Sequence, residues 1–390
     1  MLFSLASYFL VMLAIGMYAC QQSTDDIAGY ILGGRRLSPA VTALSAGASD
    51  MSGWMLLGLP GAMYLSGLSS IWIAVGLLFG ALLNYIIVAP RLRVYTEVAN
   101  NSLTIPDFFE NRFSDPSRTL RLVSSLVIVV FFTLYTSSGV VAGGKLFESA
   151  FHLDYEVGLY ITCGVVVLYT LFGGFLAVSL TDFVQGCIMF IALVLVPFVV
   201  ISDIGGLSVM HETINSLDAD KFNMFQGVSA LAIISAMAWG LGYFGQPHII
   251  VRFMAIRSVK DIPTARRIGM SWMIVSIIGA MTTGLAGIAY VAKTGLKLDD
   301  AETIFILPPS YAELQLRLNA RGLDKKEEIK KRLGEAKKEV KNGQHFDHLV
   351  VNDEFETALS DLKSIIFANK TLPKERKNFA KVCLEALLED

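Results

Sequence analysis

The stretch that most constrains the fold is residues 41–67, which are apolar enough to cross a membrane yet carry polar groups at their centre. A membrane-spanning helix needs about 20 apolar residues. Inside this stretch lies Ser49-Asp50-Met51-Ser52-Gly53, with small and apolar residues on both sides. A carboxylate in a spanning segment is costly. Asp50 therefore either pairs with a neighbouring helix or, as we favour, belongs to a functional site at a broken helix.

The composition indicates a membrane region followed by a soluble region. The 390 residues are 54% hydrophobic, and their mean hydropathy is +0.56. Residues 307–390 nevertheless hold 31 of the 66 charged side chains. No basic patch with interleaved aromatic residues is present, which argues against a nucleic-acid partner. The four cysteines have neither CxxC pairing nor metal-ligand spacing.

Eight apolar segments predict eight membrane spans. They are residues 3–19, 41–67, 71–88, 122–142, 157–171, 175–201, 230–250 and 270–291. The loops after the first, third and seventh segments hold 12 Lys and Arg residues, counting Arg93 and Arg252 as loop residues, against 4 in the opposite loops. The positive-inside rule then places the N-terminus outside. The bilayer is thus a predicted partner, and the chain returns to the outside after the eighth span.

The seventh segment is interrupted like the second. It reads Trp239-Gly-Leu-Gly-Tyr243-Phe-Gly-Gln-Pro247-His248, and its glycines and proline weaken a helix. Two interrupted helices five spans apart predict two inverted repeats with a binding site near the bilayer midplane. His248 either titrates near neutrality or, as we favour, makes a local hydrogen bond.

Other spans carry isolated polar side chains and glycines. Tyr135 either makes a hydrogen bond between helices or contacts a solute. Asp182 either serves a cation path or caps the N-terminus of a helix. Gly76 and Gly80 form a GxxxG pair, which predicts close helix packing.

One segment nearly matches a phosphate-binding loop. It reads Gly139-Val-Val-Ala-Gly-Gly144-Lys145-Leu146. The pattern needs Ser or Thr after the lysine to hold magnesium, and Leu146 occupies that position. The segment also ends an apolar helix instead of following a strand, so we reject it as a nucleotide site.

Three strings closely resemble the sodium/solute symporter family, and within it the members that take up proline. They are Tyr30-Ile-Leu-Gly-Gly-Arg35, Thr42-Ala-Leu-Ser-Ala-Gly-Ala-Ser-Asp50-Met-Ser-Gly-Trp54, and the Trp239–His248 string, in a match from about residue 1 to 306. The resemblance implies an all-α polytopic protein of the bacterial inner membrane, with thirteen spans, an outside N-terminus and a LeuT-like core of inverted repeats. It implies sodium-driven uptake of L-proline, with sodium as the coupling ion and no organic cofactor.

The resemblance also implies roles for single residues. Ala48 and Met51 would offer backbone carbonyls to sodium, and Asp50 its carboxylate. Asp182 would lie on the path by which sodium is released. The residues around proline would be Ser52, Gly53, Tyr135, Trp239, Tyr243 and Pro247.

This chain departs from the family after residue 306. The family continues with a ninth span, whose adjacent hydroxyl residues complete the sodium shell, and with further spans. Here they are replaced by a charged sequence. We therefore expect a truncated transporter with eight of thirteen spans, whose half site binds sodium weakly at best.

The charged sequence resembles the C-terminal half of guanylate kinase. A strand reaching Pro308-Pro309, a helix, a second strand within residues 346–353 and another helix are predicted. The matching strings are Phe305-Ile-Leu-Pro-Pro-Ser310, Leu318-Asn-Ala-Arg321-Gly322, Arg332-Leu333 and Val350-Val-Asn-Asp353, within residues 304–370. The resemblance implies that Arg321 and Arg332 belong to a phosphate-facing lid and that Asn352 lies near adenine. The phosphate-binding loop of such P-loop kinases is missing, so we predict no enzyme activity.

The predicted organisation is therefore composite. Residues 1–303 form the transmembrane symporter region, residues 304–370 a small α/β kinase-like fragment, and residues 371–390 a charged tail without assignment. The two resemblances meet at residues 304–306, which indicates a junction between two genes. The predicted function is sodium:proline symport, incomplete in this chain. The alternatives are symport of another organic solute, a membrane-tethered nucleotide kinase and a nonfunctional chimera. The sequence indicates no protein partner.

Overall fold

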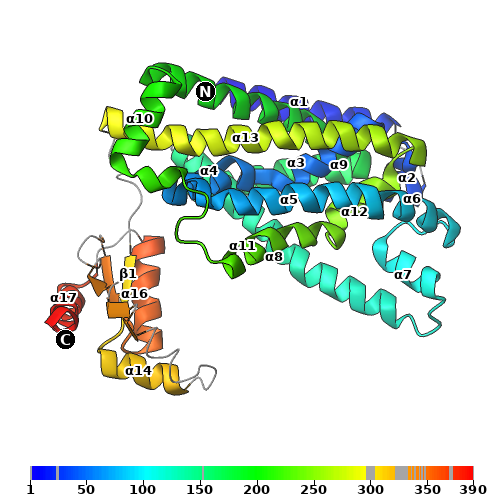
Figure 1. The fold of residues 1–390 in the computed structure, drawn as a ribbon. Coiled ribbons are helices and arrows are strands. Elements are labelled where there is room, and N and C mark those ends of the chain that lie inside the picture. The colour runs from blue at the N-terminus through cyan, green and yellow to red at the C-terminus, as the bar shows by residue number, and fades with distance from the viewer. Residues whose placement is uncertain are drawn as a thin grey trace. The chain divides into compact units, whose positions relative to one another are not determined.

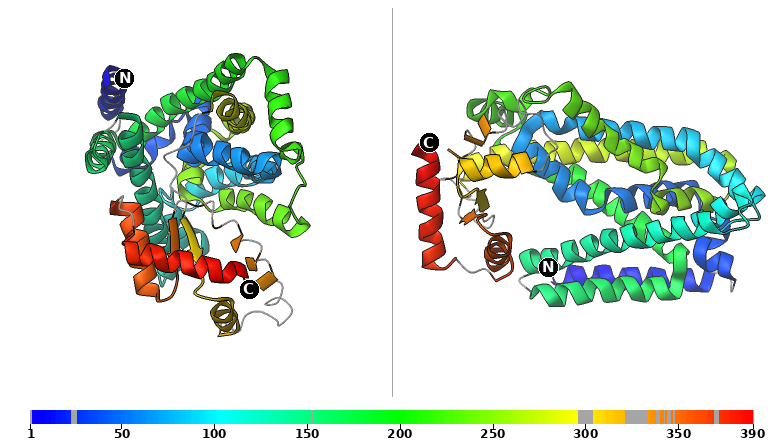
Figure 2. Two further views of the ribbon diagram at one scale, coloured as in Figure 1. Left: turned by 90° about the vertical axis from the view of Figure 1, so that its left-hand side faces the viewer. Right: turned by 90° about the horizontal axis from the view of Figure 1, so that it is seen from below.

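The computed structural model describes residues 2–22, 26–151, 153–295, 304–320, 333–334, 336–337, 340–341, 343, 346, 348–368 and 372–389 (Figures 1 and 2). The chain forms two compact units, Met1–Gly295 and Leu296–Asp390. The two resemblances placed their boundary between residues 303 and 304.

The first unit is a bundle of helices. Its α-helices are α1 (Leu2–Gln22), α2 (Ile27–Leu32), α3 (Pro39–Gly53), α4 (Leu59–Ser66), α5 (Ile71–Leu83), α6 (Ala89–Val98), α7 (Ile105–Phe113), α8 (Thr119–Phe151), α9 (Tyr155–Ile204), α10 (Leu207–Leu217), α11 (Ala230–Met237), α12 (Pro247–Ala255) and α13 (Ile262–Thr294). All eight predicted apolar segments fall on these helices and the short helical turns between them.

Five helical stretches among the described residues are long and apolar enough to cross a membrane. They are Leu5–Gln22, Pro39–Val98, Thr119–Glu148, Tyr155–Ile204 and Val259–Thr294. Two of them, with 60 and 50 residues, exceed the roughly 20 residues that one crossing needs. Both contain a glycine with positive φ, Gly67 in the first and Gly174 in the second. Glycine adopts this conformation without steric cost.

The two halves of α9 lie beside the same part of α1. In the first half, Gly158 packs against Phe147, whose ring stacks on Phe9 of α1. In the second half, Gln185 donates a hydrogen bond to the hydroxyl of Tyr8, the neighbouring residue of α1, at 2.6 Å. The chain therefore reverses at Gly174, between the fifth and sixth predicted spans.

The GxxxG pair of α5 packs closely, as predicted. Gly76 and Gly80 lie against Met237 and Gly240, which belong to α11 and the 3₁₀ turn that follows it. A Cβ atom at either glycine of α5 would overlap a backbone carbonyl oxygen. The absence of side chains lets the two backbones touch.

Two arginines that we counted as loop residues lie inside helices instead. Arg93 is in α6 and Arg252 in α12, and they are 5% and 4% exposed. Arg93 donates to the carbonyl of Ile256 at 2.6 Å. We had assumed that an arginine near the end of an apolar segment, such as Arg93 or Arg252, is exposed to solvent. A guanidinium that finds carbonyl or carboxylate partners can instead be buried.

The second unit contains a small parallel sheet with helices. Strand β1 (Ile304–Leu307) pairs with β2 (His348–Val351), with Ile304 opposite His348. The helices are α14 (Tyr311–Ala320), α16 (Phe355–Ala368) and α17 (Lys374–Glu389). Both strands and the helices after them agree with the prediction. Arg321 and Arg332 lie outside the described residues.

Helix α17 belongs to this unit. Its Ala380, Leu384 and Leu387 pack in one buried cluster with Leu307 of β1 and Val351 of β2. The residues that the sequence left as an unassigned tail therefore contribute to a hydrophobic core.

A partly buried ion pair ties α17 to the end of β2. Arg376 contacts Asp353 and Asp361, each at 2.8 Å. The hydrogen bonds from Arg376 hold the pKa of Asp353 at about 2, below its ordinary value of 3.8. The same contacts raise the pKa of Arg376. Because the carboxyl pKa is lowered in the folded state, its stabilising contribution is complete above about pH 4 and is lost as the pH falls through about 2.

We expect Gly80→Ala to destabilise the first unit by about 1–3 kcal/mol, because the added methyl group overlaps the Gly240 carbonyl. Thermal unfolding of the detergent-solubilised chain measures this. Gly164→Ala in α9 is the matched control, since no atom lies within 4 Å of the Cβ it would add. Equal melting temperatures for the two variants would contradict the close packing.

We expect Arg376→Gln to expose Cys383, a buried residue of α17, several-fold more often at pH 7 than in the unchanged chain. The ratio of the two labelling rates should fall as the pH drops through about 2 and approach one only below that pH, where Asp353 is protonated in both chains. Modification of Cys383 by dithiodipyridine, followed by mass spectrometry, measures this rate. Lys381→Gln, on the same helix, is the control. A ratio that is constant with pH would contradict the role of the Arg376–Asp353 pair.

Candidate functional site

The centre of the first unit is a break in α3. Ser38 caps the helix by accepting the N–H of Val41, and Pro39 occupies the first turn. The helix runs regularly to Ser52, whose φ of 35° and ψ of −145° are not helical. A π-helical turn, Trp54–Gly58, and α4 follow. The break lies within Ser49–Gly53, as the sequence predicted.

A second break lies between α11 and α12. The residues between them form a 3₁₀ helix, Ala238–Phe244, and α12 then begins at Pro247. The glycine-rich string therefore interrupts the helix as predicted, and the segment extends to Ala255.

The two breaks contact each other. The hydroxyl of Tyr243 donates a hydrogen bond to the Asp50 carboxylate. The rings of Trp54 and Trp239 lie 5.8 Å apart with an interplanar angle of 42°. Two segments that are almost 200 residues apart in the chain thus form one site.

Helix α8 brings an aromatic group to the first break. Tyr135 donates its hydroxyl to the backbone carbonyl of Ser49 at 3.0 Å. Its ring stacks on His248 at 5.2 Å, and Phe132 meets the same imidazole edge-on at 5.3 Å. Of the two alternatives for Tyr135, the hydrogen bond between helices is present, and contact with a solute stays a prediction.

The prediction that His248 makes a local side-chain hydrogen bond is wrong. Neither of its ring nitrogens has a hydrogen-bond partner among the described residues. Contacts with two aromatic rings hold the imidazole instead.

Asp182 lies in the interior of α9, eight residues after Gly174. An N-cap lies at the start of a helix, so the capping interpretation is wrong. One carboxylate oxygen, Oδ2, accepts three hydrogen bonds, from Ser45 at 2.8 Å, Ser49 at 2.9 Å and Arg252 at 2.8 Å.

Arg252 is the residue that completes this group, and our sequence reasoning missed it. It also donates to Ser45 at 2.9 Å, to Ser49 at 2.8 Å and to the carbonyl of His248. The side chains of Arg252 and Asp182 are only 5% and 12% exposed. The available signal was an arginine inside an apolar run, Ile249-Ile-Val-Arg-Phe-Met254, which a charge count across loops does not detect.

The structure places the predicted sodium ligands in the last turns of α3. Ala48 and Met51 are 7% and 2% exposed, and the Met51 carbonyl accepts the N–H of Trp54. The carboxylate of Asp50, between them in the chain, is directed to Tyr243.

The predicted solute residues lie at or near the two breaks, where Ser52, Gly53, Tyr135 and Trp239 are exposed, Pro247 is partly buried and Tyr243 is buried. Trp239 is 56% exposed and Tyr135 44% exposed. Ser52 and Gly53 are exposed at the break itself, and no atom lies within 4 Å of a Cβ built on Gly53.

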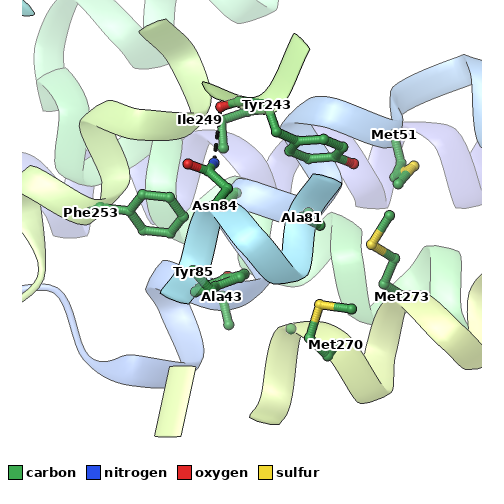
Figure 3. A pocket seen from close by; sticks show the side chains of 13 residues that line it. Ala43, Met51, Ala81, Asn84, Tyr85, Tyr243, Ile249, Phe253, Met270 and Met273 are labelled. Carbon is green, nitrogen blue, oxygen red and sulfur yellow. Dashed lines mark hydrogen bonds between the residues drawn. The ribbon is translucent and has the colours of Figure 1, made fainter. Parts of the chain in front are cut away.

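A small cavity lies beside Tyr243 (Figure 3). Its volume of about 20 Å³ holds about one water molecule, so it is too small for an amino acid. Asn84 in its wall donates to the carbonyl of Tyr243 at 3.0 Å. This buried amide, which the sequence analysis did not single out, holds the second break in place. The lining is otherwise mainly apolar and includes Ala43, Met51, Phe253, Met270 and Met273.

A larger cavity of about 660 Å³ lies between α7, α8 and α12. Pro247 and His248 line it from α12, and Ile128, Val129 and Phe132 from α8. It is mainly apolar and large enough for a small organic solute. Pro247, a predicted solute residue, is therefore part of its wall.

In the second unit, Asn352 follows β2. Its N–H donates to Leu307 at 2.8 Å, and its carbonyl accepts from Arg317 at 2.8 Å. These contacts join the two strand ends to α14.

Comparisons with known proteins agree with both parts of the chain. The Sodium:solute symporter family matches residues 30–305, and the Guanylate kinase family matches residues 287–369. The osmoregulated proline transporter OpuE of Bacillus subtilis is 60% identical over 304 residues, which are 78% of this chain and 62% of that protein. A sodium/proline symporter of Staphylococcus aureus is 55% identical over 303 residues, or 78% of this chain and 59% of the relative. The chain therefore spans about three fifths of these relatives.

A solved structure shows the same fold. It is the substrate-bound outward-open state of a Na⁺-coupled sialic acid symporter, with a TM-score of 0.65 and 19% identity. The similarity covers 76% of this chain and 63% of that one.

We expect Arg252→Gln to lower the free energy of unfolding by about 3–5 kcal/mol, because the buried Asp182 carboxylate loses its cation. The double variant Arg252→Gln with Asp182→Asn should recover part of this loss. Thermal unfolding in detergent measures both. Arg257→Gln removes an exposed pair with Asp261 and should change little. If Arg252→Gln behaves like Arg257→Gln, the buried pair does not stabilise the bundle.

Proposed function

The chain belongs to the sodium:solute symporter family, and we propose that its first unit binds sodium and L-proline as part of a sodium-driven proline uptake system. The observation that supports this most is the broken helix α3, with Asp50 at the break and the second broken helix beside it. The named relatives include a proline transporter and a sodium/proline symporter.

Sodium is proposed to bind at the end of α3. It is a hard cation that prefers oxygen ligands. The backbone carbonyls of Ala48 and Met51 and the carboxylate of Asp50 would supply them. The Asp50 carboxylate accepts a hydrogen bond from Tyr243. A sodium ion bound to this carboxylate would replace or weaken that hydrogen bond, so binding would affect both broken helices.

L-Proline is proposed to bind between the breaks. Its carboxylate suits the N-terminus of α12 at Pro247, where the helix dipole favours negative charge. Its apolar ring suits the aromatic faces of Tyr135, Trp239 and Tyr243. Ser52 and Gly53 lie at the break, where an exposed hydroxyl and the open space at the glycine allow close approach.

Transport would follow from the order of binding. Sodium binds first and orders the break in α3, proline follows, and the bundle rocks to open the site toward the inside. Asp182 would receive the departing sodium. For this, the ion pair between Asp182 and Arg252 must open, because Arg252 is bonded to the Asp182 carboxylate in this structure.

The membrane arrangement is also part of the proposal. Eight spans, an outside N-terminus and two inverted repeats, the second incomplete, agree with the two breaks, with the positive φ of Gly67 and with the reversal at Gly174. The bacterial plasma membrane is the proposed location.

We propose no kinase activity for the second unit, because the chain offers no sequence that meets the requirements of a phosphate-binding loop. The three-fifths coverage of the relatives supports a second candidate, a chain that retains the fold of the family without completing transport.

Asp50→Asn should abolish sodium-dependent proline binding, because a neutral amide replaces the only charged ligand proposed for the ion. Binding of labelled L-proline to purified chain with and without sodium, and sodium-gradient-driven uptake into vesicles, measure this. Asp203→Asn, an exposed carboxylate at the end of α9, should behave like the unchanged chain.

The two assays separate the candidates. Binding that is lost with Asp50→Asn, without uptake by the unchanged chain, favours a binding-competent remnant. Uptake lost in the same variant shows a complete transporter. Sodium-dependent binding that survives Asp50→Asn would contradict the proposed sodium site.

A further inference from the structure

Helices α6 and α7 together present a surface of exposed arginine and aromatic side chains, away from the two breaks (Figure 1). The guanidinium of Arg112 in α7 lies over the ring of Tyr95 in α6, 5.2 Å from its centroid. This contact joins the exposed faces of the two helices into one surface. We call it the arginine–aromatic patch, and its members are Arg91, Tyr95, Phe109, Arg112 and Phe113.

The patch lies at the depth where a bilayer has its headgroups. Helix α5, the π-helical turn Asn84–Val88 and α6 follow one another without a gap. At the other end of this stretch, the indole of Trp72 donates to the carbonyl of Met224 at 2.9 Å. Trp72 and Tyr95 are 23 residues apart, which is about 35 Å along a helix. The hydrocarbon core is roughly 30 Å thick, and Trp and Tyr are enriched at both of its edges, so this spacing places Tyr95 at one edge.

An apolar track leads from the patch toward the middle of the same span. Leu83, Ile87 and Arg91 recur at a spacing of four, so they share one face of the helix. Leu83 and Ile87 are each 41% exposed. Arg91 donates to the carbonyl of Ile87 at 2.8 Å, which turns its guanidinium toward the track. An acyl chain can therefore lie along this face while its headgroup stays at the patch.

The positive charge of the patch is not neutralised by the two helices that carry it. Asp107 and Glu110, the carboxylates of α7, both pair with Arg121 of α8. Glu97, the carboxylate of α6, pairs with the buried Arg93 at 2.7 Å. Neither arginine of the patch has an acidic partner within the part of the chain that the structure describes.

We propose that the arginine–aromatic patch binds the headgroup of an anionic phospholipid, with one acyl chain along Leu83 and Ile87. Guanidinium groups bind phosphate oxygens through two parallel hydrogen bonds. The ring of Tyr95 holds Arg112 in place for such a contact. A zwitterionic headgroup suits the patch less well, because its ammonium group would lie near two arginines. This site takes part in neither of the ligand contacts proposed above.

The phenyl rings of α7 support the same ligand. Phe109, Arg112 and Phe113 are three and four residues apart or adjacent, so they lie on one side of the helix. Phe113 is 66% exposed and Phe109 36% exposed. A short helix with aromatic and basic side chains on its free side is suited to lie in the plane of the membrane surface, where its rings reach the upper part of the acyl chains.

Native mass spectrometry of the full chain tests the proposal. The purified protein is stripped of excess lipid in detergent and titrated with phosphatidylglycerol or with phosphatidylcholine that has the same acyl chains. The unchanged chain should bind phosphatidylglycerol several-fold more tightly. The double variant Arg91→Gln with Arg112→Gln should weaken that binding by roughly tenfold and leave the melting temperature unchanged, because both side chains are exposed.

Arg36→Gln with Arg267→Gln is the matched control. It removes the same charge from two exposed arginines that lie outside α6 and α7, and the affinity for phosphatidylglycerol should stay unchanged. Equal losses in the two double variants would show a diffuse attraction to the whole charged surface and would overturn the site. So would an unchanged chain that binds both lipids equally.

Tyr95→Leu separates a built site from charge alone. It keeps both arginines and removes the ring on which Arg112 lies, so the affinity for phosphatidylglycerol should fall several-fold. An affinity equal to that of the unchanged chain would contradict the role of the ring. Sodium-dependent proline binding is measured on the same samples. A lipid preference without proline binding supports this site and contradicts the proposed function, and the reverse result does the opposite.

Discussion

The buried pair of Arg252 and Asp182 holds the site of the first unit together. One carboxylate oxygen accepts bonds from two serines of α3 and from an arginine of α12, while Asp182 itself belongs to α9. Removing two charges from water costs several kcal/mol per ion unless every donor and acceptor is satisfied. The serines contribute to this, since Ser45 and Ser49 each bond to both charged groups. One half of each broken helix, α3 and α12, is thereby joined to α9.

The break in α3 differs from this buried ion pair, because its polar groups each have a single hydrogen-bond partner. A helix that stops at Ser52 leaves backbone groups that the intrahelical pattern no longer pairs. In the structure they are taken up locally: Tyr135 donates to the Ser49 carbonyl, and Trp54 bonds to Met51. The Asp50 carboxylate is likewise engaged by Tyr243. Each of these contacts is single and exchangeable, which suits a site where ions and solutes replace protein donors. The site therefore combines a buried ion pair with several groups that each make one hydrogen bond.

The two units of the chain differ in where their apolar side chains lie. The first exposes large apolar surface on α8 and α9, which a bilayer can cover. The second closes a small core around two parallel strands, with α17 completing it. Membership of the symporter family describes the first unit, while the chain spans only about three fifths of its curated relatives.

The sequence by itself determined the features that depend on neighbouring residues. Apolar runs marked the helices, the polar groups around Asp50 marked the first break, the glycines and proline before His248 marked the second, and short apolar stretches near residues 304 and 350 marked both strands. These signals are local, because helix propensity and backbone freedom are properties of short segments. The tertiary structure alone decided which polar groups meet. Arg252 pairs with Asp182 across 70 residues, Tyr243 with Asp50 across 193, and Asn84 with the second break across 159. The tertiary structure also showed that Asp182 lies inside α9 and does not cap it, and that His248 packs between two aromatic rings. It placed helix α17 in the hydrophobic core of the second unit. Such pairings depend on how helices pack in space, and no spacing along the chain encodes them.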